Sequence, residues 1–237
     1  MRALRVVGFT AGALIGGASA AAAYGSVAKS SQLFGPSVFR GPGVRKSIAL
    51  TFDDGPSEST PKLLEYLDIE GIKATFFLCG QNVHRVPHIA GDVAAAGHQI
   101  GNHTYSHPHL PFKSRDFIER EFTQAQEVIQ DETGITPMLL RAPYGFRWMG
   151  MRDMQERLAL LDVMWTVIGY DWRLPSREIT DYVLGKTSAG GIVCLHDGRG
   201  VDVKPDISET LKAVREIVPR LRDDGYRFET VSEILAA

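Results

Sequence analysis

The most informative part of this 237-residue chain is Ser47-Ile48-Ala49-Leu50-Thr51-Phe52-Asp53-Asp54-Gly55-Pro56. An apolar run that ends in two adjacent carboxylates and a Gly-Pro turn predicts a buried strand that delivers both acids to the edge of a sheet. Adjacent residues on a strand point to opposite faces, so we expect Asp53 and Asp54 to have different roles.

A second motif lies downstream, in Gly101-Asn102-His103-Thr104-Tyr105-Ser106-His107. Two histidines four residues apart often lie on the surface of a helix. Here Gly101 and Pro108 leave room for little more than one helical turn. One carboxylate and two imidazoles form a three-ligand metal set that leaves positions open for water and substrate. The second aspartate then remains free to transfer protons, and together these residues predict a metal-assisted hydrolase.

Strand-like and helix-like segments alternate along the chain. We expect strands at 48–52, 74–78, 99–101, 138–141, 163–167, 192–195 and 227–230, and helices at 60–69, 86–96, 117–133, 152–161, 177–186 and 208–224. Alternation of strands and helices of these lengths indicates parallel βαβ units. The pattern predicts a single α/β domain, a distorted (β/α) barrel that need not be complete, with about seven parallel strands and its chemistry at their carboxyl ends.

Ionisable side chains follow five of the expected strands. Besides the first two motifs, they occur in Arg141-Ala142-Pro143-Tyr144-Gly145, in Asp171-Trp172 and in Cys194-Leu195-His196-Asp197. Taken singly, each motif also fits a turn, a salt bridge or a helix cap. Their shared position after strands favours one common site at the barrel mouth. The other histidines have no matching partner and are expected to be structural or exposed: His84, His88, His98 and His109.

Composition excludes some classes of protein. Hydrophobic residues make up 44% and charged residues 23% of the chain, which is ordinary for a globular domain. The formal net charge is −2 and no Lys/Arg run exceeds a pair, so binding to nucleic acid is not expected. Cys79 and Cys194 each end an apolar run and are expected to be buried free thiols.

The N-terminus has the pattern of an export signal. Arg2 and Arg5 precede an uncharged stretch, 6–27, and the Ala-rich residues 18–23 offer small-residue cleavage sites. We expect residues 1–23 to be a signal peptide or an uncleaved membrane anchor, with a flexible tail as the third alternative. Residues 24–45 are expected to be an irregular lead-in, and 46–237 the catalytic domain. The protein would then be exported, and attached to a membrane only if the leader is not cleaved.

Together the motifs resemble the polysaccharide deacetylase family, the NodB-homology enzymes of carbohydrate esterase family 4. The resemblance extends over residues 46–233, and segments 51–56 and 103–107 match the family pattern in full. Three positions depart from it: Ala142 replaces a common proline, Ile168 replaces an aspartate, and Cys194 replaces the usual leucine.

The resemblance implies a role for each motif residue. Asp54, His103 and His107 would bind a divalent metal, with zinc expected and cobalt, nickel or iron as alternatives. Asp53 would be the base, with its charge state set by Arg141. His196 would be the acid, oriented by Asp171. Tyr144, through its backbone N–H, and Trp172 would line the oxyanion and substrate site.

The same resemblance implies the substrate. We expect a monomer that removes N-acetyl groups from N-acetylglucosamine-containing glycans such as peptidoglycan, chitin or chitooligosaccharides. An O-acetyl esterase acting on xylan-type polysaccharides is the first alternative, because the same site could perform that reaction. A non-catalytic glycan-binding protein is the second, but it predicts the loss of a ligand or base, and all of them are present.

Overall fold

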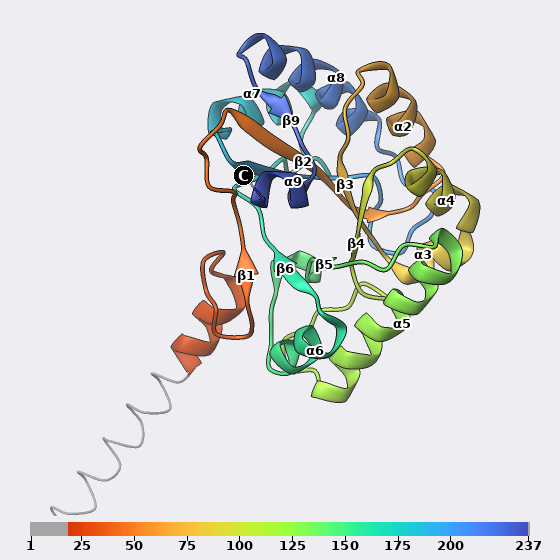
Figure 1. Ribbon diagram of the computed structural model, residues 1–237, viewed down its shortest axis with the longest axis vertical. Coiled ribbons are helices and arrows are strands. Elements are labelled where there is room, and N and C mark those ends of the chain that lie inside the picture. The colour runs from red at the N-terminus through yellow and green to blue at the C-terminus, as the bar shows by residue number, and fades with distance from the viewer. Residues whose placement is uncertain (1–18, 237) are drawn as a thin grey trace, which may run out of the picture.

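The strands form one parallel sheet in the computed structural model, which describes residues 19–236 (Figure 1). The sheet order is β1-β6-β5-β4-β3-β2-β8-β7, and β9 also pairs with β2. The strands are β1 (Ser37–Val38), β2 (Ser47–Gly55), β3 (Thr75–Leu78), β4 (Gln99–Asn102), β5 (Leu139–Leu140), β6 (Leu161–Val163), β7 (Val167–Ile168), β8 (Gly191–His196) and β9 (Arg227–Phe228).

Helices cover the outer face of this sheet in an arc, from α7 and α8 through α2 and α4 to α5 and α6 (Figure 1). They are α2 (Thr60–Ile69), α3 (Gly80–Arg85), α4 (Pro87–Ala95), α5 (Arg115–Thr133), α6 (Met151–Leu158), α7 (Ser176–Lys186), α8 (Ser208–Asp223) and α9 (Val231–Leu235), with a 3-10 turn η1 (Pro143–Gly145). Sequence signals set their ends. In α5, for example, the Ser114 side chain accepts a hydrogen bond from the Phe117 N–H, and Gly134 closes the helix at φ 71°.

The sheet is strongly curled, as the connection between β6 and β7 shows. These strands lie near opposite ends of the sheet order, yet only residues 164–166 join them. A connection this short spans at most about 14 Å, so the two ends of the sheet must approach each other. The Met164 N–H donates to Val38 O at one end, and the Thr166 N–H donates to Ile192 O at the other. Within residues 19–236, no pairing joins β1 to β7, so the barrel is bridged but not closed.

Strand β2 separates two hydrophobic cores. Ile48, Leu50 and Phe52 pack in the core between sheet and helices, whereas Ala49 packs in the barrel interior. This alternation is the period of two that a strand dictates. Asp53 lies four residues after Ala49 on the same strand, so the alternation places it on the interior side as well.

The fold class is confirmed: one α/β domain, a distorted and incomplete barrel of parallel strands. One element prediction was wrong: the strand expected at 163–167 is two strands, β6 and β7, separated by the bridging residues. The helix expected at 86–96 is confirmed as α4, but the sequence pattern did not reveal α3, which precedes it. The cysteine prediction is confirmed, since Cys79 and Cys194 are both buried and free.

The N-terminal segment is partly regular. The leader predicted at 1–23 lies mostly outside the described residues, which begin with a helical stretch at 19–27. The lead-in expected to be irregular, 24–45, includes the end of this helix and strand β1. Between residues 19 and 236, no helix has both the length and the hydropathy needed to cross a membrane.

Candidate active site

Asp54 sits where β2 leaves its regular geometry. Its φ of 71° lies in the left-handed region, and the register with β3 shifts between Asp53 and Gly55. Left-handed backbone is costly for a residue other than glycine and is concentrated at functional sites. The turn redirects Asp54 so that it lines the cavity at the barrel mouth. Simple strand alternation therefore does not describe the pair. Asp53 points into the barrel, and Asp54 faces the cavity because the strand bends.

Asp54, His103 and His107 converge on one point. Oδ1 of Asp54 lies 3.2 Å from Nε2 of His103 and 3.0 Å from Nε2 of His107. One ligand atom from each residue lies within 4.8 Å of the others. Burial acts to raise the pKa of Asp54, but hydrogen bonds from both histidines hold it well below its ordinary value. The carboxylate is therefore ionised at neutral pH.

Neighbouring groups hold these three side chains in place. The Gly200 N–H donates to Oδ2 of Asp54 at 2.7 Å, which leaves Oδ1 for the histidines. Nδ1 of His103 lies 2.8 Å from the Arg141 carbonyl oxygen, a contact that directs Nε2 toward Asp54. Outer contacts of this kind are typical of metal-ligating histidines. The O/N/N donor set and its fixed orientation fit a divalent transition metal.

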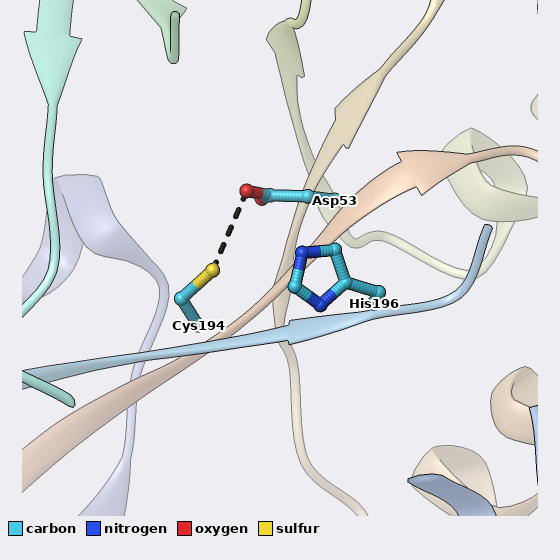
Figure 2. Close-up of side chains that lie close together, drawn as sticks. All are labelled: Asp53, Cys194 and His196. Carbon is cyan, nitrogen blue, oxygen red and sulfur yellow. Dashed lines mark hydrogen bonds between the residues drawn. The ribbon is translucent and has the colours of Figure 1, made fainter. Parts of the chain in front are cut away.

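Asp53 is held by Arg141 beneath the cavity. Arg141 is fully buried, and its Nη1 donates to Oδ1 of Asp53 at 2.6 Å and to Oγ1 of Thr51 at 2.7 Å. The second oxygen, Oδ2, lies 3.4 Å from Sγ of Cys194 (Figure 2). Both carboxylate oxygens therefore have a protein donor, and the Asp53 side chain is fixed in one orientation.

His196 is held by Asp171. Nδ1 of His196 lies 2.8 Å from Oδ1 of Asp171, whose Oδ2 accepts a hydrogen bond of 2.7 Å from Oγ1 of Thr210. Burial acts to lower the pKa of His196, but the charge and hydrogen bond of Asp171, with the charges of Asp54 and Asp53, raise it to about 9. His196 is therefore a protonated imidazolium at neutral pH.

The cavity at the barrel mouth has a volume of about 560 Å³. It is lined by Asp54, His103, His107, Tyr144, Gly145, Trp165, Ile168, Trp172, His196, Arg199 and Gly200. Tyr144, with φ 59°, and Trp172 stand on its rim and are 50% and 46% exposed. They are thus available to a ligand that enters the cavity.

All nine site residues expected from the sequence lie in or directly behind this cavity. Asp54, His103, His107, Tyr144, Trp172 and His196 line it, whereas Asp53, Arg141 and Asp171 are buried behind it. Several contributors were not predicted. Gly200 and Thr210 lie in segments without a distinctive pattern. His109, expected to be structural or exposed, is exposed but stacks face to face on Tyr144 with 3.9 Å between ring centroids.

Comparisons with known proteins agree with this geometry. The chain is 36% identical over 195 residues to a peptidoglycan-N-acetylglucosamine deacetylase of Bacillus cereus, covering 81% of this chain and 70% of the relative. It is 33% identical over 194 residues to a chitooligosaccharide deacetylase of Azorhizobium caulinodans, covering 78% and 92%. A crystal structure of a peptidoglycan N-acetylglucosamine deacetylase superposes with a TM-score of 0.78 at 33% identity, covering 84% of this chain and 92% of that one.

The profile of the polysaccharide deacetylase family itself matches residues 40–161. That span includes the Asp53-Asp54 pair, both histidines of the three-ligand cluster, and Arg141. Asp171 and His196 follow beyond it, and the fold brings them to the same cavity. The chain therefore belongs to the polysaccharide deacetylase family.

Proposed function

We propose that this protein is a metal-dependent deacetylase that removes N-acetyl groups from N-acetylglucosamine-containing glycans. The observation that carries the proposal is the meeting of three groups at one cavity: the Asp54–His103–His107 cluster, the Asp53–Arg141 pair and the His196–Asp171 pair. The relatives named for peptidoglycan and chitooligosaccharides support the substrate class. Both are polymers or oligomers that carry N-acetylglucosamine.

A divalent metal on Asp54, His103 and His107 would supply a Lewis acid that polarises the acetyl carbonyl and makes water more acidic. Asp53 accepts the proton of the attacking water, since its carboxylate lies outside the ligand cluster. Arg141 keeps that carboxylate in one orientation through the 2.6 Å contact. Nε2 of His196 then gives a proton to the departing nitrogen. The proton on Nδ1 stays on the ring, because it is hydrogen-bonded to Asp171.

The protonated state of His196 favours amide cleavage. An amine leaves poorly unless its nitrogen is protonated, whereas an alkoxide from an ester depends less on an acid. Because the pKa of His196 is raised to about 9, the acid is available across the neutral range. This supports N-acetyl over O-acetyl groups as the preferred target.

The experiment is acetate release from a defined panel: N-acetylglucosamine oligomers, peptidoglycan and acetylated xylan. We expect the N-acetylated glycans to be turned over faster than the xylan. Much faster release from the xylan would replace the amide assignment by an ester assignment. No release from any of the three by metal-loaded enzyme would favour a non-catalytic glycan-binding protein.

A variant of the acid sharpens this test. His196→Ala should lower amide cleavage by about 10²–10⁴-fold. It should lower cleavage of an activated aryl acetate much less, because that leaving group departs without a proton. Equal losses on both substrates would contradict the role of His196 as the acid.

Zinc is the metal we propose, because imidazole and carboxylate ligands with open positions suit it. Cobalt, nickel and iron share this preference. Metal analysis of protein purified without added metal, followed by reconstitution of the metal-free form with each ion, identifies the metal. Highest activity with another of these ions would correct the assignment while keeping the site.

We also propose that the protein is exported and acts outside the cytoplasm as a monomer. Arg147 donates hydrogen bonds to the carbonyl oxygens of Ser26, Ala28 and Ser31, so residues 26–31 are part of the fold. Cleavage upstream of residue 24 would keep these contacts in the mature protein, which supports that position. Mass spectrometry of the secreted protein should place its first residue near Ala20 or Ala23. Intact protein in the membrane fraction would indicate an anchor instead, and intact soluble cytoplasmic protein would rule out both.

A further inference from the structure

Asp53, Cys194 and His196 form a second cluster of metal-ligating groups beside the first. They come from neighbouring strands, since β2 and β8 pair with Thr51 opposite Cys194 and Asp53 opposite His196. Figure 2 shows the three side chains converging from the two strands. One ligand atom from each residue lies within 4.8 Å of the others, and the Sγ–Oδ2 separation is 3.4 Å.

The two clusters share no residue, and they offer different ligand atoms. Asp54, His103 and His107 offer one oxygen and two nitrogens, whereas the second cluster offers oxygen, sulfur and nitrogen. Sulfur is present because Cys194 stands where the family pattern has leucine. A thiolate favours soft cations over magnesium or calcium. The 3.4 Å separation between Sγ and Oδ2 suits a four-coordinate ion with metal–ligand bonds of about 2.0–2.3 Å.

We propose that Asp53, Cys194 and His196 form a second, inhibitory site for a soft divalent cation such as Zn²⁺ or Cd²⁺. The inhibition rests on the proposed function, because it requires Asp53 and His196 to be the base and the acid. The binding itself does not depend on that function.

Binding requires the cation to displace protons. Burial, together with the charge of Asp53, raises the pKa of the Cys194 thiol well above its ordinary value, so the thiol carries its proton and points it at Oδ2. A coordinating cation takes the place of that proton: the S–H bond breaks, a sulfur–metal bond forms, and the proton goes to solvent. Nδ1 of His196 faces Asp171, so Nε2 is the nitrogen left to bind, after releasing its own proton.

Access and local charge both permit binding. His196 lines the 560 Å³ cavity, so a cation can reach its ring from solvent. The buried Arg141 guanidinium opposes a further positive charge. The carboxylates of Asp53 and Asp171, with the thiolate formed on binding, outweigh it. A cation bound here would occupy the oxygen that accepts a proton and the nitrogen that donates one, which stops turnover.

Cadmium titration followed by ultraviolet absorption tests the proposal, because a cadmium–thiolate bond absorbs and a cadmium ion on oxygen and nitrogen alone does not. We expect wild-type protein to show this absorption and to bind a second equivalent in equilibrium dialysis. Cys194→Ser should lose both, whereas the matched variant Cys79→Ser should keep both. Cys79 is equally buried but lies outside the cluster.

Activity gives the functional side of the test. Excess Zn²⁺ should inhibit the wild type and Cys79→Ser, but it should inhibit Cys194→Ser far less. The rate of each protein in excess Zn²⁺ is compared with the rate of the same protein at one equivalent of Zn²⁺. Wild-type protein without cadmium–thiolate absorption would overturn the site. So would absorption that survives in Cys194→Ser but disappears in Cys79→Ser. Absorption in a protein without deacetylase activity would uphold the site and contradict only the proposed function.

Discussion

Asp171 contacts His196 at two points: Oδ2 accepts the His196 backbone N–H at 2.9 Å, and Oδ1 lies 2.8 Å from the ring Nδ1. Thr210 adds a hydrogen bond to Oδ2, and the Arg199 guanidinium donates to the Asp171 carbonyl oxygen at 3.0 Å. Burial acts to raise the pKa of Asp171, but the charge and hydrogen bond of His196 hold it below its ordinary value. The pair is therefore an ion pair at neutral pH, and the ring cannot rotate without breaking it.

The alkaline limit of activity should follow His196. The acid must be protonated, and the pKa is raised from 6.5 to about 9, so the rate should stay high through neutrality and fall as pH rises through about 9. A pH profile of kcat/KM on an N-acetylglucosamine oligomer measures this decline, which is the alkaline limb of the profile. A decline centred near pH 6.5 would show that the ion pair does not control the acid.

Replacing Asp171 by asparagine should move this limb to lower pH. Asp171→Asn removes the nearest charge that raises the pKa of His196, while the burial that lowers it remains. The same pH profile measures the shift. Asp153→Asn, at an exposed ion pair with Arg115, is the control and should leave the limb in place. An unchanged limb in Asp171→Asn would contradict the role of Asp171.

The sequence patterns predicted most of the helices and strands because each has a strong local signal. Helix α5, for instance, has Ser114 before it and Gly134 after it. The split of 163–167 into β6 and β7 has no such signal. The segment is an apolar run, and its middle residues turn inward only because the curled sheet needs a bridge. The split depends on which distant strands pair with each half of the segment, and the local sequence does not indicate that pairing.

The site residues were predictable from their positions after strands, but their support was not. Strand alternation assigns Asp53 to the barrel interior correctly. It cannot show that Asp54 turns to the cavity, because that depends on a left-handed φ of 71°. Gly200 holds Asp54 through its backbone N–H, a group that nearly every residue has, so the sequence at this position does not indicate the contact. Cys194 stood out in the sequence as a departure, but only the strand register brings it to Asp53.

Arg147 should be critical for stability. It is buried, binds carbonyl groups of residues 26–31 and lies 3.8 Å from the buried Asp162 carboxylate. Arg147→Ala leaves that carboxylate without its partner, so we expect a loss of about 3–5 kcal/mol in unfolding free energy. Urea unfolding measures it, and hydrogen exchange should rise in residues 26–31. Arg115→Ala, at an exposed pair, should cost only about 0–1 kcal/mol. Equal losses in both variants would contradict the prediction.

Gly198 should be essential to the placement of Asp54. A Cβ at this position would lie 2.1 Å from the Asp54 carbonyl oxygen and 2.8 Å from its Cβ, which is too close for the backbone to stay in place. Gly198→Ala should therefore weaken metal binding at the cluster. Calorimetric zinc titration measures the affinity. Gly185→Ala is the control, because nothing lies within 4 Å of a Cβ there. Unchanged affinity in Gly198→Ala would show that the loop can adjust.

The division of roles between the two adjacent aspartates is the central claim, and the metal content of two variants tests it most directly. Asp53→Asn should keep its metal and lose about 10²–10⁴-fold in turnover, because it removes a proton acceptor and not a ligand. Asp54→Ala should lose both metal and activity, because three ligands leave no substitute. Elemental analysis after dialysis, beside acetate release, gives both quantities. A metal-free Asp53→Asn together with a metal-loaded Asp54→Ala would contradict the assignment.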